Sequence, residues 1–228
     1  MQIQGIEKVS MVDYPNKIAT TIFTGGCNFR CPFCHNSGIV EKKYDNILEE
    51  DVLQYLESRK GLIDAVVVSG GEPTLQSDLD KFISKLKEMN FLVKLDSNGT
   101  NPFVLKKLLD SKLLDYVAID IKTNFDDYSA ITGVKNPNTS NIKETVEILR
   151  NSGIPYELRT TLINEFHAEE NIKKMADELA GEKVLYLQKF VASENCIQKD
   201  LTEVPKMKAI YFANILSQKI ERVILRGY

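Results

Sequence analysis

Short apolar runs alternate with amphipathic helical patterns along most of this chain, and this alternation limits its fold more than any other feature. The runs are nearly continuous in apolar residues, as expected of strands that are covered on both faces. Apolar residues recur at helical spacing between several runs, as at Leu48, Val52 and Leu56. We predict strands at Ile18–Thr24, Ala65–Ser69, Leu92–Ser97, Tyr116–Ile121, Tyr156–Leu162 and Val184–Phe190.

Strands that alternate with helices in this way predict a parallel sheet with helices outside it. A doubly wound sheet and a complete or partial barrel both satisfy the pattern, although six units are too few for a closed eight-stranded barrel. In either architecture, ligands gather at the carboxyl ends of the strands. A chain of 228 residues suits one large domain over 1–228.

Three cysteines lie close together in a loop, 25–36, that directly follows the first predicted strand. Cys27, Cys31 and Cys34 have the spacing C-x3-C-x2-C. Thiolates at such spacing suit an iron–sulfur cluster or zinc. Structural zinc needs a fourth ligand, and only distant Cys196 or neighbouring His35 could supply it. A [4Fe–4S] cluster normally takes four cysteines, so three would leave one iron open to a substrate or cofactor. Three buried cysteines without a metal are the remaining alternative.

A second motif follows the second predicted strand, where Ser69–Pro73 reads S-G-G-E-P. Together with C-x3-C-x-aromatic-C, in which Phe33 is the aromatic residue, it resembles the signature of the radical S-adenosylmethionine (SAM) superfamily. The resemblance implies an incomplete (β/α)6 TIM-like barrel with the cluster at its mouth. It also implies that SAM binds the open iron through its amino and carboxylate groups.

The residues that would hold these cofactors follow from the same resemblance. Cys27, Cys31 and Cys34 would carry the [4Fe–4S] cluster. The loop that contains Gly70, Gly71 and Glu72 would contact the SAM amino group.

Four further segments resemble the activating enzymes of glycyl radical enzymes. They are Ser10–Pro15 (S-M-V-D-Y-P), Cys31–Asn36 (C-P-F-C-H-N), Asp96–Gly99 (D-S-N-G) and Asp120–Lys122 (D-I-K). The resemblance spans nearly the whole chain. Its nearest form is the anaerobic ribonucleoside-triphosphate reductase activating protein, followed by the pyruvate formate-lyase activating enzyme.

Several polar residues at predicted strand ends are candidates for contacts with SAM. Lys122 is a compact cation suited to the SAM carboxylate, and Asp120 can accept hydrogen bonds from ribose hydroxyls. By resemblance, Asp96 and Asp120 could instead hold a monovalent cation. Asn98 could bind SAM or serve as a turn residue. Arg159 could face SAM or be structural.

The remaining histidines and the fourth cysteine carry weaker signals. His35 could tune the cluster or be an ordinary polar loop residue. His167 matches no motif and is expected to be structural, and Cys196 lacks a neighbouring thiol for a second cluster.

The resemblance implies an iron-dependent oxidoreductase that works under anaerobic conditions. Reductive cleavage of SAM would give a 5′-deoxyadenosyl radical, which removes hydrogen from one glycine of a partner enzyme. No catalytic side chain beyond the cluster and SAM is expected. The implied partners are a glycyl radical enzyme and a flavodoxin- or ferredoxin-type electron donor.

Composition excludes several other functions. A net charge of −3 gives no electrostatic reason to expect nucleic acid or an anionic membrane as a partner. No stretch approaches the about 20 apolar residues that span a bilayer. The first residues lack the apolar run of a signal peptide, so a cytoplasmic location is expected.

Two rival functions remain at this point. One is a radical SAM enzyme that acts on a small molecule, such as 7-carboxy-7-deazaguanine synthase. The other is a zinc-stabilised binding module without catalysis, which metal and sulfide analysis would distinguish.

Overall fold

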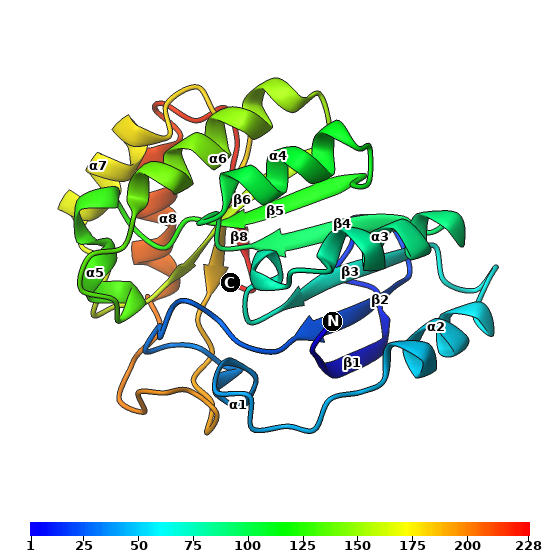
Figure 1. The fold of residues 1–228 in the computed structure, drawn as a ribbon. Coiled ribbons are helices and arrows are strands. Elements are labelled where there is room, and N and C mark those ends of the chain that lie inside the picture. Colours follow the sequence, from blue (N-terminus) through cyan, green and yellow to red (C-terminus); the bar gives the residue numbers. More distant parts are fainter.

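Eight strands pair in chain order, from β1 to β8, in a computed structural model that describes residues 1–228 (Figure 1). The strands are β1 (Ile3–Ser10), β2 (Ala19–Thr24), β3 (Ala65–Gly70), β4 (Leu92–Ser97), β5 (Tyr116–Asp120), β6 (Tyr156–Leu162), β7 (Leu185–Lys189) and β8 (Val223–Arg226). The helices are α1 (Ser37–Val40), α2 (Glu49–Glu57), α3 (Leu79–Glu88), α4 (Pro102–Asp110), α5 (Tyr128–Thr132), α6 (Thr139–Ser152), α7 (Glu169–Glu178) and α8 (Lys206–Leu216). Short 3-10 helices follow β3 (η1, Pro73–Leu75) and β5 (η2, Phe125–Asp127).

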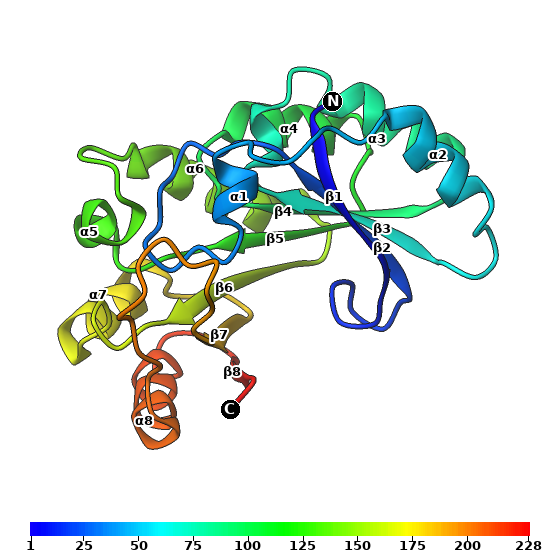
Figure 2. The same cartoon turned by 90° about the horizontal axis from the view of Figure 1, so that it is seen from below.

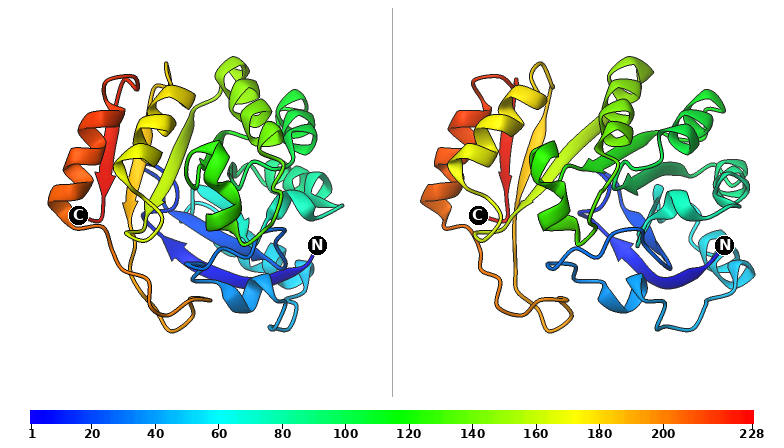
Figure 3. Two further views of the ribbon diagram at one scale, coloured as in Figure 1. Left: turned by 90° about the vertical axis from the view of Figure 1, so that its left-hand side faces the viewer. Right: turned by 60° about the vertical axis from the view of Figure 1, so that its left-hand side comes forward.

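The sheet is open, because its edge strands β1 and β8 each pair with one strand of the sheet and not with each other. β1 is antiparallel to β2, whereas every pair from β2 to β8 is parallel. The strands curve around a common interior with the larger helices outside, and β1 and β8 lie at opposite edges (Figure 3). This arrangement is a partial TIM-like barrel, which confirms the expected fold class.

The predicted strands are confirmed to within one residue at each end. Their apolar runs are buried because helices cover the outer face, and Ala65, Val66, Val67 and Val68 of β3 are all at most 1% exposed.

The predicted count of six strands was too low, because both edges extend further. At one edge β8 continues the parallel sheet beyond β7. β1 was missed because it is an antiparallel edge strand of mixed polarity, IQGIEKVS, and its register with β2 shifts at two places.

The loops at the carboxyl ends of β2, β3, β4 and β5 carry the four cofactor motifs, so they meet at one end of the barrel. The β1–β2 connection lies at the opposite end, well away from α8, which packs beside β8 at the other edge of the sheet (Figure 2). None of the helices is long and apolar enough to cross a membrane.

Candidate functional site

The three cysteines of the loop after β2 line one cavity of about 240 Å³ at the barrel mouth. The Phe29 backbone N–H donates to Cys27 Sγ at 3.4 Å, and the Cys34 N–H donates to the Cys31 carbonyl at 3.0 Å. Burial raises the pKa of all three thiols, that of Cys31 to about 12. Metal binding must therefore displace their protons.

The donor set fits a four-iron cluster better than a single ion. No three His, Cys, Asp or Glu side chains of the chain converge closely enough to hold one metal ion. A four-iron cluster binds each cysteine to a different iron and so holds the sulfurs farther apart than a tetrahedral zinc ion does. Three free thiols around a shared cavity suit the cluster and leave one iron without a protein ligand.

Charged side chains from β4, β5 and β6 line the same cavity. Arg159 donates from Nε to Asp120 Oδ1 and from Nη1 to Asp96 Oδ2, both at 2.9 Å. Lys122 Nζ lies 2.9 Å from Asp120 Oδ2 and 5.6 Å from the centroid of the Phe33 ring. The structure thus places Arg159 in the cavity, between Asp96 and Asp120. These are the two aspartates that were expected to contact SAM or a monovalent cation, and the cation stays a prediction.

The protonation states of this group follow from its contacts. Burial alone would raise the pKa of the Asp120 carboxyl, but the charges of Arg159 and Lys122 hold it well below its usual range. Burial would lower the pKa of Lys122, but the charge of Asp120 raises it above the ordinary value. Both side chains are therefore ionised at neutral pH, and Lys122 presents a cation at the barrel mouth.

The loop after β3 is fixed against the cysteine loop by backbone bonds. The Gly71 N–H donates to the Thr24 carbonyl, and the Glu72 N–H donates to the Gly26 carbonyl, both at 2.8 Å. Gly70 and Gly71 line the cavity. The glycines thus bring this loop into contact with the backbone that precedes Cys27.

Glu72 is fully buried, and protein donors already occupy its carboxylate. Oε1 accepts bonds from the Thr74 N–H, the Thr74 hydroxyl and the Ser97 hydroxyl, and Oε2 accepts from the Asn98 N–H at 2.7 Å. Glu72 therefore braces its own turn against the loop after β4. Its assignment as a contact of SAM stays a prediction.

Asn98 links the loop after β4 to the cysteine loop through Asn28, a residue that the sequence analysis did not single out. Its Nδ2 donates to Asn28 Oδ1 at 2.7 Å and lies 4.0 Å from Cys27 Sγ. Asn28 in turn donates to the Thr100 hydroxyl at 2.8 Å. Its position directly after Cys27 was the one feature of the sequence that could have identified Asn28 as a site residue. Asn98 thus serves both as a turn residue, whose Oδ1 accepts the Thr100 N–H, and as part of the cavity lining.

The two histidines and the fourth cysteine lie in different places relative to the cavity. His35 lines the cavity and stacks on Phe190, with centroids 5.6 Å apart. Cys196 is buried with its Sγ 3.8 Å from the Phe33 carbonyl, outside the cavity lining. His167 is buried too, and its Nε2 lies 3.0 Å from the carbonyl of Lys122, so it supports that residue's backbone, as expected of a structural histidine.

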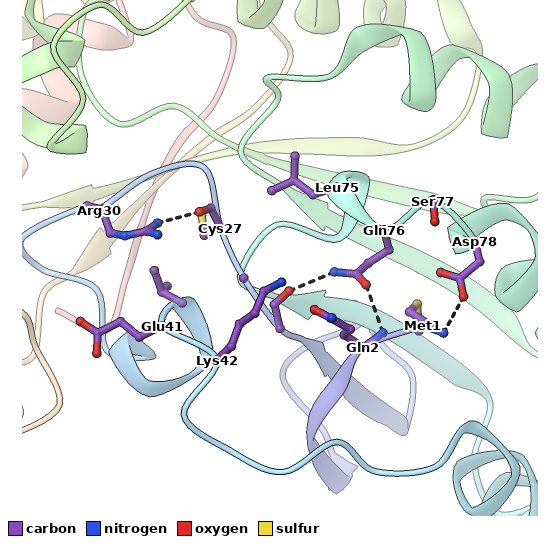
Figure 4. Close-up of a pocket in the computed structure, with 13 residues that line it drawn as sticks. Met1, Gln2, Cys27, Arg30, Glu41, Lys42, Leu75, Gln76, Ser77 and Asp78 are labelled. Atoms are coloured by element: carbon purple, nitrogen blue, oxygen red, sulfur yellow. Dashed lines mark hydrogen bonds and ion pairs between the residues drawn. The ribbon is translucent and has the colours of Figure 1, made fainter.

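A larger cavity, of about 660 Å³, lies on the outer side of the cysteine loop (Figure 4). Its polar lining includes Arg30, which donates to the Cys27 carbonyl, and Gln76, which donates to the Gly25 carbonyl. It contains Cys27 but neither of the other two cysteines, nor Lys122. The smaller cavity is therefore the candidate site, because only there do the thiols and the charged residues meet.

Known proteins resemble this chain in sequence and in fold. The family model described as the radical SAM superfamily matches residues 21–179. A candidate glycyl-radical enzyme activating enzyme of Methanocaldococcus jannaschii is 31% identical over 98% of this chain and 95% of its own length. The pyruvate formate-lyase-activating enzyme of Clostridium pasteurianum is 32% identical over 77% of this chain and 75% of its own length. The structure of Streptococcus suis SuiB bound to its precursor peptide SuiA has a TM-score of 0.70 at 14% identity, over 91% of this chain and 48% of that one, which shows a shared fold.

Proposed function

Because the chain belongs to the radical SAM superfamily, among the activating enzymes of glycyl radical enzymes, we propose that it installs a glycyl radical on anaerobic ribonucleoside-triphosphate reductase. The cofactors of this family are a [4Fe–4S] cluster and SAM. The observation that carries the proposal is the open barrel mouth, where the thiols, Lys122 and the glycines Gly70 and Gly71 surround one cavity. Since β1 and β8 do not pair, a polypeptide loop has an open side from which to approach.

The cofactor contacts are assigned to residues in the cavity and to the loop beside it. Cys27, Cys31 and Cys34 hold the irons. Lys122 binds the SAM carboxylate, because it is the cation of the cavity that faces the thiols. The Gly70–Glu72 loop binds the SAM amino group, and Asp96, Asn98 and Asp120 contact the rest of SAM or a monovalent cation.

The protein's contribution to the reaction is placement and exclusion of water. When bound together, the cluster and SAM supply a one-electron reductive cleavage that yields a hydrogen-abstracting carbon radical. The bonds from Gly71 and Glu72 to the backbone before Cys27 keep the SAM-binding loop in register with the cluster loop. Arg159 bonds to both Asp96 and Asp120 and so holds these carboxylates in one orientation in the cavity. A radical on that glycine is stabilised by its two flanking peptide groups.

The partner and the electron donor complete the proposal. We favour the anaerobic reductase over pyruvate formate-lyase because the Ser10–Pro15 stretch is nearer to its activating proteins. A flavodoxin- or ferredoxin-type protein supplies the electron. The whole of 1–228 acts as a single radical SAM domain.

Electron paramagnetic resonance on the cognate mixture tests the function. With SAM and a one-electron reductant, a doublet from a glycyl radical should appear on the reductase together with 5′-deoxyadenosine. The Cys27→Ala variant should give neither product, whereas Cys196→Ala should give both. If the doublet appears only with another glycyl radical enzyme, that enzyme and not the reductase is the partner. Deoxyadenosine formed with a small molecule, and no doublet with any such enzyme, would establish the small-molecule rival instead.

The Lys122→Met variant tests the SAM site separately from the function. The methionine keeps the apolar stem but loses a charge-assisted contact, so SAM affinity should fall on the order of ten- to a hundredfold. Iron and sulfide content should stay unchanged. Lys143→Met is the matched control, because its Nζ also lies over an aromatic ring, Phe125 at 4.9 Å, but outside the site. Isothermal titration that gives wild-type Kd values for both variants would remove Lys122 from the site.

A further inference from the structure

The loop that joins β1 to β2 closes the barrel at the end opposite the cysteines. Ser10 Oγ accepts bonds from the N–H groups of Val12 and Asp13, which fixes the turn. Asp13 Oδ2 accepts the Thr21 hydroxyl at 2.6 Å, and the Tyr14 ring lies 5.7 Å from that of Tyr116. These contacts aim the Asp13 carbonyl at the barrel interior.

That carbonyl accepts a hydrogen bond from a buried lysine on β4. Lys94 is 2% exposed, and its Nζ donates to the Asp13 carbonyl at 2.7 Å and lies 2.8 Å from Asp96 Oδ1. Glu157 Oε1 on β6 is 4.0 Å away. An unpaired ammonium would be strongly unfavourable at such a position, so these partners are needed for it to stay charged.

From Lys94 to the barrel mouth, the interior carries a chain of side chains whose charges alternate in sign. Asp96 is bound by Arg159, Arg159 also binds Asp120, and Asp120 pairs with Lys122. Residues two apart on a strand point to the same face, which is why Lys94 and Asp96, and likewise Glu157 and Arg159, share the interior. Arg226 on β8 closes the network with a 3.1 Å contact to Glu157.

The network has one more cation than anions. Its four cations face three carboxylates: Lys94, Arg159, Lys122 and Arg226 against Asp96, Asp120 and Glu157. Arg159 and Lys94 outweigh the effect of burial and keep the pKa of Asp96 below its ordinary value, and Arg159 and Lys122 do the same for Asp120, so both aspartates carry charge. Lys122 and Arg159 are the two cations of the network that line the cavity.

We propose that Lys94 is a positioning residue for SAM binding, and that it acts by giving the network the net positive charge that favours the SAM carboxylate at Lys122. Without Lys94 the interior cations and carboxylates balance, and the network then offers no excess positive charge to the SAM carboxylate. The Ser10–Pro15 loop thereby gains a role, since its Asp13 carbonyl holds Lys94 in place. The inference rests on the proposed SAM site.

Charge rescue tests this proposal. Lys94→Met should weaken SAM binding a few-fold, because one charge about 10 Å away changes the binding of a carboxylate roughly tenfold at an effective dielectric constant of about 20, and the positive sulfonium of SAM offsets part of that effect. The double variant Lys94→Met/Glu157→Gln restores the excess of one cation and should recover most of the affinity. Neither Lys94 nor Glu157 lines the cavity, so neither substitution removes a contact with SAM. Isothermal titration of SAM into anaerobically reconstituted protein gives the affinity, and iron and sulfide analysis confirms the cluster.

The outcomes separate this inference from the site on which it rests. Weaker binding in Lys94→Met without recovery in the double variant would overturn charge balance in favour of simple loss of packing. Wild-type affinity in Lys94→Met, with reduced affinity in Lys122→Met, would overturn the role of Lys94 alone. If Lys94→Met does not fold, Arg226→Gln removes a cation from the half-exposed end of the same network. It should weaken SAM binding in the same direction by a smaller factor, and unchanged affinity there would count against the proposal.

Discussion

Replacing any one of Cys27, Cys31 or Cys34 with alanine should abolish the [4Fe–4S] cluster. Wild-type protein reconstituted without oxygen should hold about four irons and four sulfides per chain. With two thiolates left, a second iron loses its protein ligand, and the remaining thiols regain protons because burial raises their pKa. Iron and sulfide analysis with absorption spectroscopy measures the loss.

Cys196→Ala is the matched control for these variants. Cys196 is buried like Cys31, but it lies outside the cavity lining, against the Phe33 carbonyl. The control should therefore keep full iron and sulfide content. Stoichiometric zinc without sulfide in the wild-type protein would contradict the cluster assignment and return the site to the zinc alternative.

Gly71→Ala should separate the two cofactor loops and destabilise the protein. A Cβ at this position would lie 1.9 Å from the Gly26 carbonyl oxygen, which is backbone and cannot move aside alone. The bonds from the Gly71 and Glu72 N–H groups across the two loops would break. Overpacking of this kind costs about 3 kcal/mol or more. Thermal unfolding should shift down by roughly 6–12 °C, and SAM binding should be lost.

Gly5→Ala is the control for this substitution. The nearest atom to its added Cβ is a Phe23 side-chain carbon at 3.4 Å, and its φ is not in the left-handed region. The variant should unfold within a few degrees of the wild type and bind SAM normally. If both glycine variants had the same unfolding temperature and SAM affinity, the contact between the two loops would not be needed for SAM binding, which would contradict the proposed role of that contact.

Local chemistry in the sequence determined the fold class and the cluster ligands. A strand covered on both faces needs a continuous apolar run, so the interior strands were visible from their residues to within one position. The cysteine spacing and the S-G-G-E-P motif are short, and each directly follows such a strand. Because parallel strands place their carboxyl ends together, the meeting of Cys27, Gly71 and Lys122 at one cavity could be predicted without coordinates.

The tertiary structure alone decided the properties that depend on partners distant in the chain. β1 gave no clear pattern, because an edge strand with one neighbour needs no continuous apolar run. Glu72 stood in a recognisable motif, yet its carboxylate is occupied by donors from its own turn and from the loop after β4. Lys94 and Glu157 looked like ordinary polar residues in their strands, because sequence spacing shows which residues share a face but not that this face is the barrel interior. Their charges acquire meaning only when curvature of the sheet brings β4, β6 and β8 around one enclosed space.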